Sequence, residues 1–381
     1  MTRTIVAMSG GVDSSVAAAL LAQAGEDVVG IWMRLHDVAD SVSEFKKSCC
    51  SLDAAEDARR VAGQLGIPFY ILNLEREFAR GVLEPFLAAY QDGRTPSPCI
   101  DCNSFVKFGA LLGQARRLYD AEFVATGHYA RRVTRSDGRA ELHRAKDGDK
   151  DQTYFLYGLR QDQLAASRFP LGELTKPEVR EVARSLGLAT AEKPESQGIC
   201  FVPGGDYREA LRERAGWNPK PGAIVDADGT RVGDHAGSAG FTVGQRGGLG
   251  VALGAPRYVS RIDPISNTIT LGRREDLETT TIELSTVSFV DGGPPSADEF
   301  RAEVRIRHRG EPIAGTVRPA ESRARPRRWI VETDSPVWAA APGQAAVLYD
   351  GERCLGGGRI EPAATASATS SSTSSATAAV A

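Results

Sequence analysis

Apolar runs and helix-spaced apolar positions alternate along the first part of the chain. Short runs typical of buried strands lie at residues 5–7, 27–33, 68–72 and 122–129. Between them, apolar residues recur every three or four positions, the spacing of one helical face, at residues 16–25, 53–66, 78–87 and 103–119. This alternation predicts an α/β domain with a doubly wound parallel sheet and helices on both faces. In such sheets, ligands bind beyond the carboxyl ends of the strands.

The pattern changes near residue 206, where glycine, short β-prone runs and turn dipeptides take over. Just before that point, Thr175 and Glu178 have capping-box spacing and predict one more helix start. The later region predicts two small, mainly β modules. We expect the α/β domain at 1–205, a small β-rich domain at 206–275, a C-terminal β module at 276–362 and a tail at 363–381. The tail is almost wholly alanine, serine and threonine, so it should be disordered.

The composition is that of a soluble globular protein, with 41% hydrophobic and 25% charged residues among 381. No apolar run approaches the roughly 20 residues that span a bilayer, and the N-terminus has no signal-peptide pattern. We therefore expect a cytoplasmic protein with no membrane partner. The net charge of −3 means that any nucleic-acid surface must come from local basic patches.

The cysteines favour metal binding or catalysis over structural disulfides, because the expected compartment is reducing. They are Cys49, Cys50, Cys99, Cys102, Cys200 and Cys354. Cys99-x-x-Cys102 has the spacing of half a zinc site, but no second pair follows at a suitable distance. We therefore expect no metal held by these cysteines.

The stretch Met8-Ser9-Gly10-Gly11-Val12-Asp13-Ser14-Ser15 lies between the first strand and the first helix. Its glycines let the backbone approach a ligand closely, and the helix N-terminus offers unpaired N–H groups to an anion. It is not a Walker A loop, because no Gly-Lys-Ser/Thr is present, nor a spaced-glycine dinucleotide turn. It resembles the PP-loop of ATP pyrophosphatases, which split ATP into AMP and pyrophosphate. The alternative is an ordinary glycine turn before a helix capped by Asp13.

Two cysteines are candidates for chemistry. Cys102 directly precedes a helix that we expect Asn103 to cap, and both the helix dipole and nearby Lys107 would favour its thiolate. The segment 95–98 in front of it should be a stiff, extended loop that holds a nucleophile in position. The alternative is a cysteine packed at a helix start. Cys200 lies in a glycine-containing polar loop, and its alternative is a buried cysteine that opens a short strand.

Arg305, Arg307 and Arg309 alternate with other residues, so they would share one face of a strand. Other arginines lie nearby in the sequence: Arg301, Arg318, Arg323, Arg325, Arg327 and Arg328. This locally basic module suits phosphate contacts to nucleic acid. The alternative is a solvated strand face without a ligand.

Six motifs in order resemble the tRNA-specific 2-thiouridylase family over nearly the whole chain, up to about residue 362. They are residues 8–15, residues 93–96 leading to Cys102-Asn103, residues 125–129, 150–156, 198–201 and 241–246. The resemblance implies a PP-loop domain of the adenine nucleotide alpha hydrolase type, with a C-terminal β-barrel that contacts tRNA. It implies ATP as co-substrate with Mg²⁺. The 2-oxygen of the wobble uridine would be adenylated and then replaced by sulfur.

The same resemblance implies roles for the two cysteines and two kinds of partner. Cys200 matches the carrier of a persulfide, delivered by a cysteine desulfurase or a sulfur-relay protein. Cys102 matches the partner thiol, which either attacks the persulfide or assists at the uridine. Either route can leave a Cys102–Cys200 disulfide that must be reduced afterwards. The nucleic-acid partner would be the anticodon stem-loop of tRNA.

The binding residues are also carried over by similarity. ATP would be held by Ala7, Met8, Ser9, Gly10, Gly11, Val12, Asp13, Ser14, Met33 and Gly127. The target base would lie near Ser97, Pro98 and Cys99, and further tRNA contacts would come from Lys150, Asp151, Gln152, Arg307 and His308. Many relatives have an Asn-Pro-Asp-like triplet where this chain has Ser97-Pro98-Cys99, which weakens any role that depends on the carboxylate.

Two other functions compete with thiolation of the 2-position. One is a different PP-loop enzyme: a 4-thiouridine or cytidine thiolase, or an ATP-dependent amide or amidine synthase, the synthase needing no cysteine pair. The other is a tRNA-binding module that holds ATP only as a structural ligand. We further expect the loop that carries Cys200 to fold over the site when tRNA binds.

Overall fold

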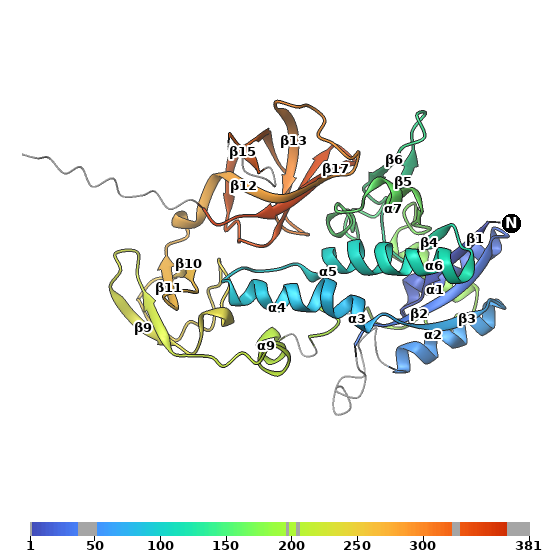
Figure 1. The fold of residues 1–381 in the computed structure, drawn as a ribbon, viewed down its shortest axis with the longest axis horizontal. Helices are drawn as coiled ribbons and strands as arrows, with labels where there is room; N and C mark the ends of the chain where they lie inside the picture. Colours follow the sequence, from blue (N-terminus) through green and yellow to red (C-terminus); the bar gives the residue numbers. More distant parts are fainter. Residues whose placement is uncertain (1, 37–51, 196–197, 203–205, 322–327, 364–381) are drawn as a thin grey trace, which may run out of the picture.

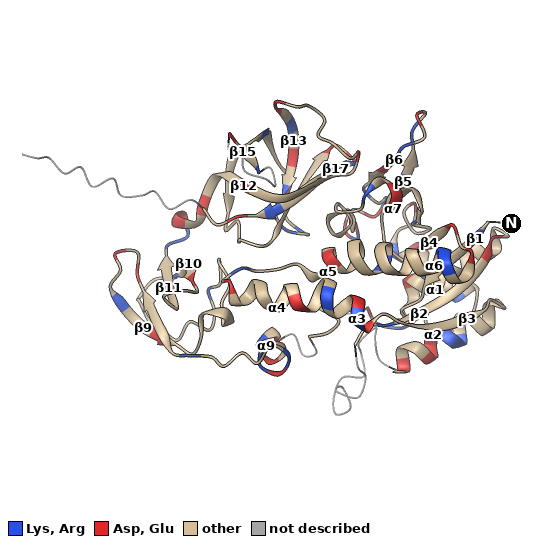
Figure 2. Ribbon diagram, in the orientation of Figure 1, with Lys and Arg blue, Asp and Glu red and all other residues tan. Residues whose placement is uncertain are grey.

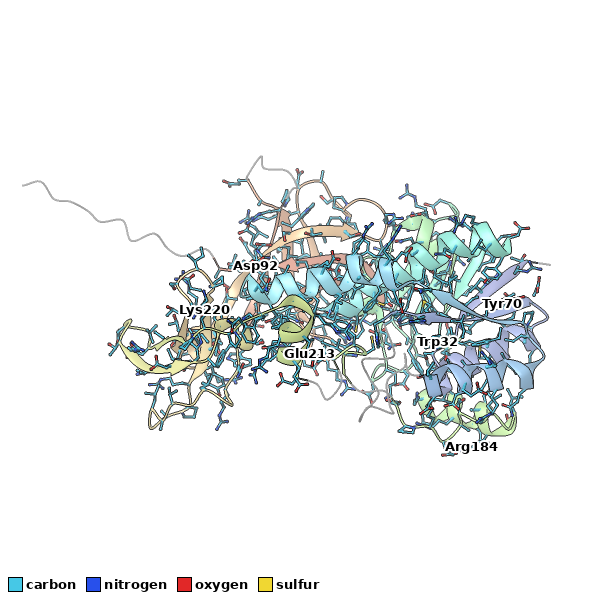
Figure 3. All side chains as sticks on the ribbon, turned by 60° about the horizontal axis from the view of Figure 1, so that its bottom comes forward. Trp32, Tyr70, Asp92, Arg184, Glu213 and Lys220 are labelled. Carbon is cyan, nitrogen blue, oxygen red and sulfur yellow. The ribbon has the colours of Figure 1, made fainter. Side chains whose placement is uncertain are left out.

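The computed structural model describes residues 2–36, 52–195, 198–202, 206–321 and 328–363. Its α/β domain, a smaller β-sheet and a β-barrel are visible in Figure 1. In Figure 3, Tyr70 of the α/β domain and Lys220 of the small β-rich domain lie toward opposite ends of the molecule. Among the predictions above, those for Cys49, Cys50, Arg323, Arg325, Arg327 and nearly all of the tail fall outside the described residues.

The α/β domain is built on a parallel sheet with strand order β3-β2-β1-β4-β7. The strands are β1 (Arg3–Ala7), β2 (Asp27–Arg34), β3 (Phe69–Asn73), β4 (Phe123–Ala125) and β7 (Ser167–Arg168). Alternate residues of β1 enter different apolar clusters, with Ile5 in one and Val6 in the other. Both faces of the sheet are therefore covered, which confirms the predicted doubly wound architecture.

Helices form the two covering layers. The cluster around Val6 includes residues of α1 (Val12–Gln23), α2 (Leu52–Leu65) and α8 (Lys176–Ser185). The cluster around Ile5 includes residues from α3 (Glu75–Phe78), α4 (Glu84–Gln91), α5 (Pro98–Asp101), α6 (Leu112–Tyr119), α7 (Gln161–Ala165) and α9 (Tyr207–Ala215). Two π-helical segments, Ala79–Leu83 and Cys102–Leu111, join α3 to α4 and α5 to α6.

The helix expected at 103–119 begins earlier than predicted. Pro98 is its first residue, and the chain stays helical through α5, the π segment and α6. The predicted N-cap role of Asn103 is wrong, because its side-chain amide instead donates to the carbonyl oxygen of Phe155 at 3.0 Å. The strand expected at 122–129 is also shorter, since only Phe123–Ala125 pairs in the sheet.

The region after residue 206 contains two β structures. The smaller is a four-stranded sheet of order β10-β11-β8-β9, formed by β8 (Gly222–Val225), β9 (Arg231–His235), β10 (Tyr258–Asp263) and β11 (Thr268–Gly272). The larger contains β12 (Glu278–Phe289), β13 (Phe300–Arg305), β14 (Ile313–Pro319), β15 (Trp329–Trp338), β16 (Ala345–Asp350) and β17 (Arg353–Ile360). Pairing of β12 with both β15 and β17 closes these six antiparallel strands into the expected barrel.

A hairpin of the α/β domain extends the barrel sheet. Its strands are β5 (Arg131–Thr134) and β6 (Ala140–His143), and β6 pairs with β17 through Arg353 opposite His143. The barrel is therefore joined to the α/β domain by backbone hydrogen bonds.

The barrel also holds the segment that leads into the helix of Cys102. Arg94 makes a two-point ion pair with Glu361, at 3.1 and 2.9 Å. The amide of Thr95 donates to the carbonyl oxygen of Pro342 at 2.7 Å. Arg359, on β17, donates to Asp101 of α5 at 2.6 Å. The barrel therefore fixes the start of α5, four residues before Cys102.

We expect Arg359→Met to destabilise the protein by about 3 kcal/mol, because Asp101 would keep a largely buried charge without its partner. The two side chains are only 17% and 21% exposed. Urea unfolding measures the loss. Arg301→Met is the matched control, because Arg301 pairs with Asp334 at the surface, where ion pairs contribute little. Equal losses in both variants would contradict this reading of the Arg359–Asp101 pair.

Candidate site for ATP and sulfur transfer

The loop between β1 and α1 is held in shape by its own hydroxyl groups. The Oγ of Ser14 accepts from the amide of Ser9 at 3.1 Å and donates to the carbonyl oxygen of Gly11 at 3.1 Å. Gly10 has φ +70°, and a Cβ there would lie 2.2 Å from the carbonyl oxygen of Ala54 on α2. Only glycine fits both the angle and the space. The loop is thus preformed at the carboxyl end of β1, where an anion would meet the start of α1.

Gly127 lies directly against this loop. It follows β4, the neighbour of β1, and a Cβ on it would come within 2.7 Å of backbone atoms of Asp13 and Ser14. Met33, near the end of β2 on the other side of β1, is half-buried. The fold therefore gathers the predicted ATP residues from three adjacent strand ends, although they lie far apart in the sequence.

Three residues that the sequence reasoning missed surround Asp13 and the loop. Lys176 Nζ lies 2.6 and 2.8 Å from the two carboxylate oxygens of Asp13. The hydroxyl of Tyr129 donates to Asp13 at 2.8 Å. Lys193 Nζ donates to the carbonyl oxygen of Gly10 at 2.8 Å and to Asp57 at 2.6 Å. Nothing local to these positions signals the contacts, because both lysines reach the loop from more than 160 positions away.

Cys102 is buried and lies inside the helix rather than before it. It is the first residue of the π segment, one turn beyond Pro98. The first-turn N–H groups, which interact most strongly with a negative charge, therefore belong to α5. A π segment within a helix is often found at functional sites.

Cys200 is half-buried in a turn, so the short strand considered for it is absent. Its neighbour Phe201 is buried against Phe78 and Phe86, with ring centroids 5.3 and 5.1 Å away. These rings belong to the α3–α4 helix, and α3 packs against the π segment that begins at Cys102. Both cysteines contribute to the same apolar cluster, and no disulfide joins one to the other. The disulfide implied by the resemblance is therefore not present in this state.

The predicted target-base residues divide by exposure. Ser97 and Pro98 are buried at the start of α5, whereas Cys99 is exposed. The part of the chain that the structure describes contains no group of three or more His, Cys, Asp or Glu residues arranged to hold a metal.

Lys150, Asp151 and Gln152 are positioned beside the loop by interior hydrogen bonds. Asp151 is 3% exposed, and its carboxylate accepts from the hydroxyl of Thr153 at 2.8 Å. The side-chain oxygen of Gln152 accepts from the amide of Tyr129 at 2.9 Å. Lys150 points toward Glu195, with Nζ 2.9 Å from a carboxylate oxygen. Asp151 and Gln152 thus fix the backbone, and Lys150 adds a positive charge beside Glu195.

Arg307 and His308 do not continue the strand as predicted. β13 ends at Arg305, and the following residues form a turn, so the shared strand face for Arg305, Arg307 and Arg309 is wrong. Arg307 donates to the carbonyl oxygen of Ala339 at 3.0 Å. The ring centroids of His308 and Phe155 are 4.5 Å apart. Burial lowers the pKa of His308. The turn therefore meets the segment that follows Gln152.

Among the arginines that were expected to form a basic barrel face and that the structure describes, most are paired with acids. Arg301 binds Asp334, Arg318 binds Glu332, and Arg328 binds Glu283. Figure 2 shows both signs of charge on the barrel. The described part of the barrel therefore does not present a uniform arginine stripe.

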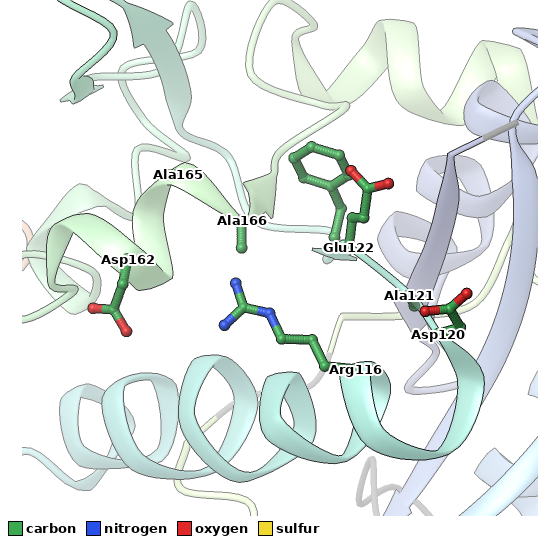
Figure 4. Close-up of a pocket in the computed structure, with 8 residues that line it drawn as sticks. Arg116, Asp120, Ala121, Glu122, Asp162, Ala165 and Ala166 are labelled. Carbon is green, nitrogen blue, oxygen red and sulfur yellow. The ribbon is translucent and has the colours of Figure 1, made fainter.

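Figure 4 shows a surface pocket at the other end of β4 from Gly127. Charged residues Arg116, Asp120, Glu122 and Asp162 line it. Because ligands of such sheets bind at the carboxyl ends of the strands, the candidate site lies at Gly127 and not at this pocket. No helix in the described residues is long and apolar enough to cross a membrane.

Comparison with known proteins agrees with this geometry. Residues 2–204 match the tRNA methyl transferase HUP domain, 212–273 the tRNA methyl transferase PRC-barrel domain and 279–360 the aminomethyltransferase beta-barrel domain. The tRNA-specific 2-thiouridylase MnmA of Chloroflexus aggregans is 50% identical over 94% of this chain and 98% of its own. The chain belongs to the tRNA-specific 2-thiouridylase family.

Other relatives of the 2-thiouridylase family match equally fully. The MnmA proteins of Roseiflexus castenholzii and Moorella thermoacetica are 48% and 47% identical, each over 94% of this chain and 99% of theirs. Among solved structures, an NMN synthetase from Francisella tularensis matches with 20% identity and a TM-score of 0.32, over 55% of this chain and 71% of that one. That likeness is too low to support an argument.

Proposed function

We propose that this chain is a tRNA 2-thiouridylase that uses ATP to activate the 2-oxygen of the wobble uridine and a cysteine persulfide to replace it with sulfur. One observation carries the proposal. A preformed PP-loop shares one domain with two cysteines, Cys102 and Cys200, that contribute to the same apolar cluster. That domain lies in a chain about half identical, over nearly its full length, to tRNA-specific 2-thiouridylases.

The activation step is assigned to the PP-loop. A carbonyl oxygen is a poor leaving group, and transfer of AMP to it makes it a good one. The loop from Ala7 to Ser14 would hold the triphosphate, with Met33 and Gly127 beside the adenosine. Mg²⁺ would neutralise the departing pyrophosphate. Asp13 is the loop's acidic group, but it is already bound by Lys176 and Tyr129, so we expect the ion to be held mainly by phosphate oxygens.

The sulfur step is assigned to the cysteines. The terminal sulfur of a Cys200 persulfide attacks C2 of the adenylated uridine, and AMP leaves with the former 2-oxygen. The Cys102 thiolate then attacks the Cys200 sulfur, which breaks its bond to the transferred sulfur and leaves 2-thiouridine. In the other order, Cys102 attacks the persulfide first and the released hydrosulfide attacks C2. Both routes oxidise the two thiols to a disulfide, which an external thiol must reduce.

The partners follow from the same chemistry. The anticodon stem-loop of tRNA would contact Lys150 and, separately, Arg307 and His308, and the target base would enter near Cys99. A cysteine desulfurase or a sulfur-relay protein would supply the persulfide. We propose that the reaction takes place in the cytoplasm.

A nucleoside analysis tests this function. Unmodified tRNA is incubated with the protein, ATP, Mg²⁺ and a persulfide donor, then digested and analysed by mass spectrometry. We expect 2-thiouridine together with AMP and pyrophosphate in equal amounts. AMP and pyrophosphate without a thiolated base would mean a different PP-loop enzyme, and tight binding without either product would mean a tRNA-binding module.

A further inference from the structure

The PP-loop has an unusual charge for a site that binds a triphosphate. Residues 8–15 contain no lysine or arginine, and the loop's ionisable side chain is the carboxylate of Asp13. A bound polyphosphate would therefore meet a negative charge unless cations come from elsewhere in the fold. Within the described residues, Lys176 and Lys193 reach the loop, and of these two lysines it is Lys176 that contacts Asp13.

Lys176 is held at the loop by a rigid element. Thr175 and Glu178 form the capping box of α8, with the amide of Thr175 donating to Glu178 at 2.6 Å, and Lys176 is the first residue of that helix. α8 packs against α1, which begins at the PP-loop. The lysine side chain is only 9% exposed. A buried ammonium needs anions around it, so this position is built for charge recognition.

The ammonium group of Lys176 has three N–H donors and three close carboxylate oxygens. Two belong to Asp13, at 2.6 and 2.8 Å. The third is an oxygen of Glu195, at 3.1 Å. Glu195 is shared, because Lys150 lies 2.9 Å from its other oxygen, and the two lysines lower its pKa, Lys150 the more strongly. Of the three contacts, the one to Glu195 is the longest, and Glu195 keeps a partner when that contact breaks.

We propose that Lys176 binds a phosphate group of ATP and that Glu195 is the counter-ion which this phosphate displaces. The proposal rests on the proposed use of ATP and adds a binding residue to that site. Asp13 keeps the ammonium in place through its two contacts, and the phosphate takes the donor that Glu195 releases. Glu195 then pairs with Lys150 alone. Lys193 meanwhile steadies the loop through the Gly10 carbonyl oxygen.

Substitutions of Lys176 and Glu195 should therefore change the affinity for ATP in opposite directions. Lys176→Gln removes a charge-assisted hydrogen bond to phosphate and should weaken ATP binding about tenfold. Glu195→Gln removes the competing carboxylate and should tighten ATP binding about threefold. Glu192→Gln is the matched control, because Glu192 is an exposed glutamate three positions away that pairs with Arg184. Its affinity for ATP should equal that of the wild type.

Isothermal titration of the full chain with Mg-ATP, without tRNA, measures these affinities, and circular dichroism checks each fold. Wild-type affinity in Lys176→Gln would overturn the proposal. So would a loss of affinity in Glu195→Gln, because a merely structural ion pair weakens binding when either partner is removed. If Lys176→Gln fails to fold, the direction in which Glu195→Gln changes the affinity for ATP tests the proposal by itself. A wild-type protein that binds ATP but makes no 2-thiouridine would overturn the proposed function and not this inference.

Discussion

Cys200→Ser is expected to lower the formation of 2-thiouridine from a protein-bound persulfide by about a thousandfold, because the serine hydroxyl carries no sulfur and forms no persulfide. The PP-loop does not use Cys200, so ATP binding should be unchanged. Formation of 2-thiouridine is measured by mass analysis of digested tRNA, and ATP affinity by titration. The donor must be limiting, because free sulfide could bypass the carrier.

Cys354→Ala is the matched control. Cys354 is another cysteine of the chain, but it is fully buried on β17, and burial raises its thiol pKa well above the usual value. It should retain thiolation within about threefold, since a buried neutral thiol acts as a small apolar side chain. Thiolation by Cys200→Ser at the wild-type rate, with limiting donor, would contradict the carrier role.

Gly127→Ala is expected to lower ATP-dependent thiolation about a hundredfold, because misplacing reactive groups by an ångström has effects of that size. The new Cβ would lie 2.7 Å from the backbone of Asp13 and Ser14, which is closer than real Cβ contacts. Backbone atoms on both sides prevent an easy adjustment, so the PP-loop must shift. Pyrophosphate release in the presence of tRNA measures the first step.

Gly63→Ala controls for the general effect of an added methyl group. Gly63 lies within α2, and a Cβ there would meet nothing within 4 Å. The control should keep full activity and gain stability by about 0.5–1 kcal/mol, since alanine favours helices over glycine. Equal activity in the two variants would show that Gly127 does not set the shape of the loop.

The local parts of this fold could be predicted from the sequence. The spacing of apolar residues predicts the alternation of strands and helices in the α/β domain. The capping-box pattern at Thr175 predicts the start of α8. Residue type alone places the start of the helix that carries Cys102 too late, because asparagine at position 103 is a good N-cap. Pro98 is the better signal, because proline fits the first turn of a helix, although the prolines of segment 95–98 predict an extended loop.

The partners of the site could not be predicted in the same way. Lys176 contacts Asp13, and Glu195 contacts Lys150, through tertiary packing. No rule of sequence spacing relates positions so far apart. Arg307 looked like part of a strand by its period of two, but β13 ends at Arg305 and the turn binds the Ala339 carbonyl oxygen instead. Alternating arginines share one face of a strand only where the strand extends over all of them.

The most direct test of the account follows the oxygen that leaves the uridine. A tRNA anticodon stem-loop with ¹⁸O at the 2-position of the wobble uridine is incubated with the protein, ATP, Mg²⁺ and a persulfide donor. The AMP and pyrophosphate are then weighed by mass spectrometry. The account predicts that ¹⁸O appears in the phosphate of AMP, in an amount equal to the 2-thiouridine formed, with pyrophosphate unlabelled. 2-Thiouridine formed together with unlabelled AMP would contradict adenylation of the 2-oxygen.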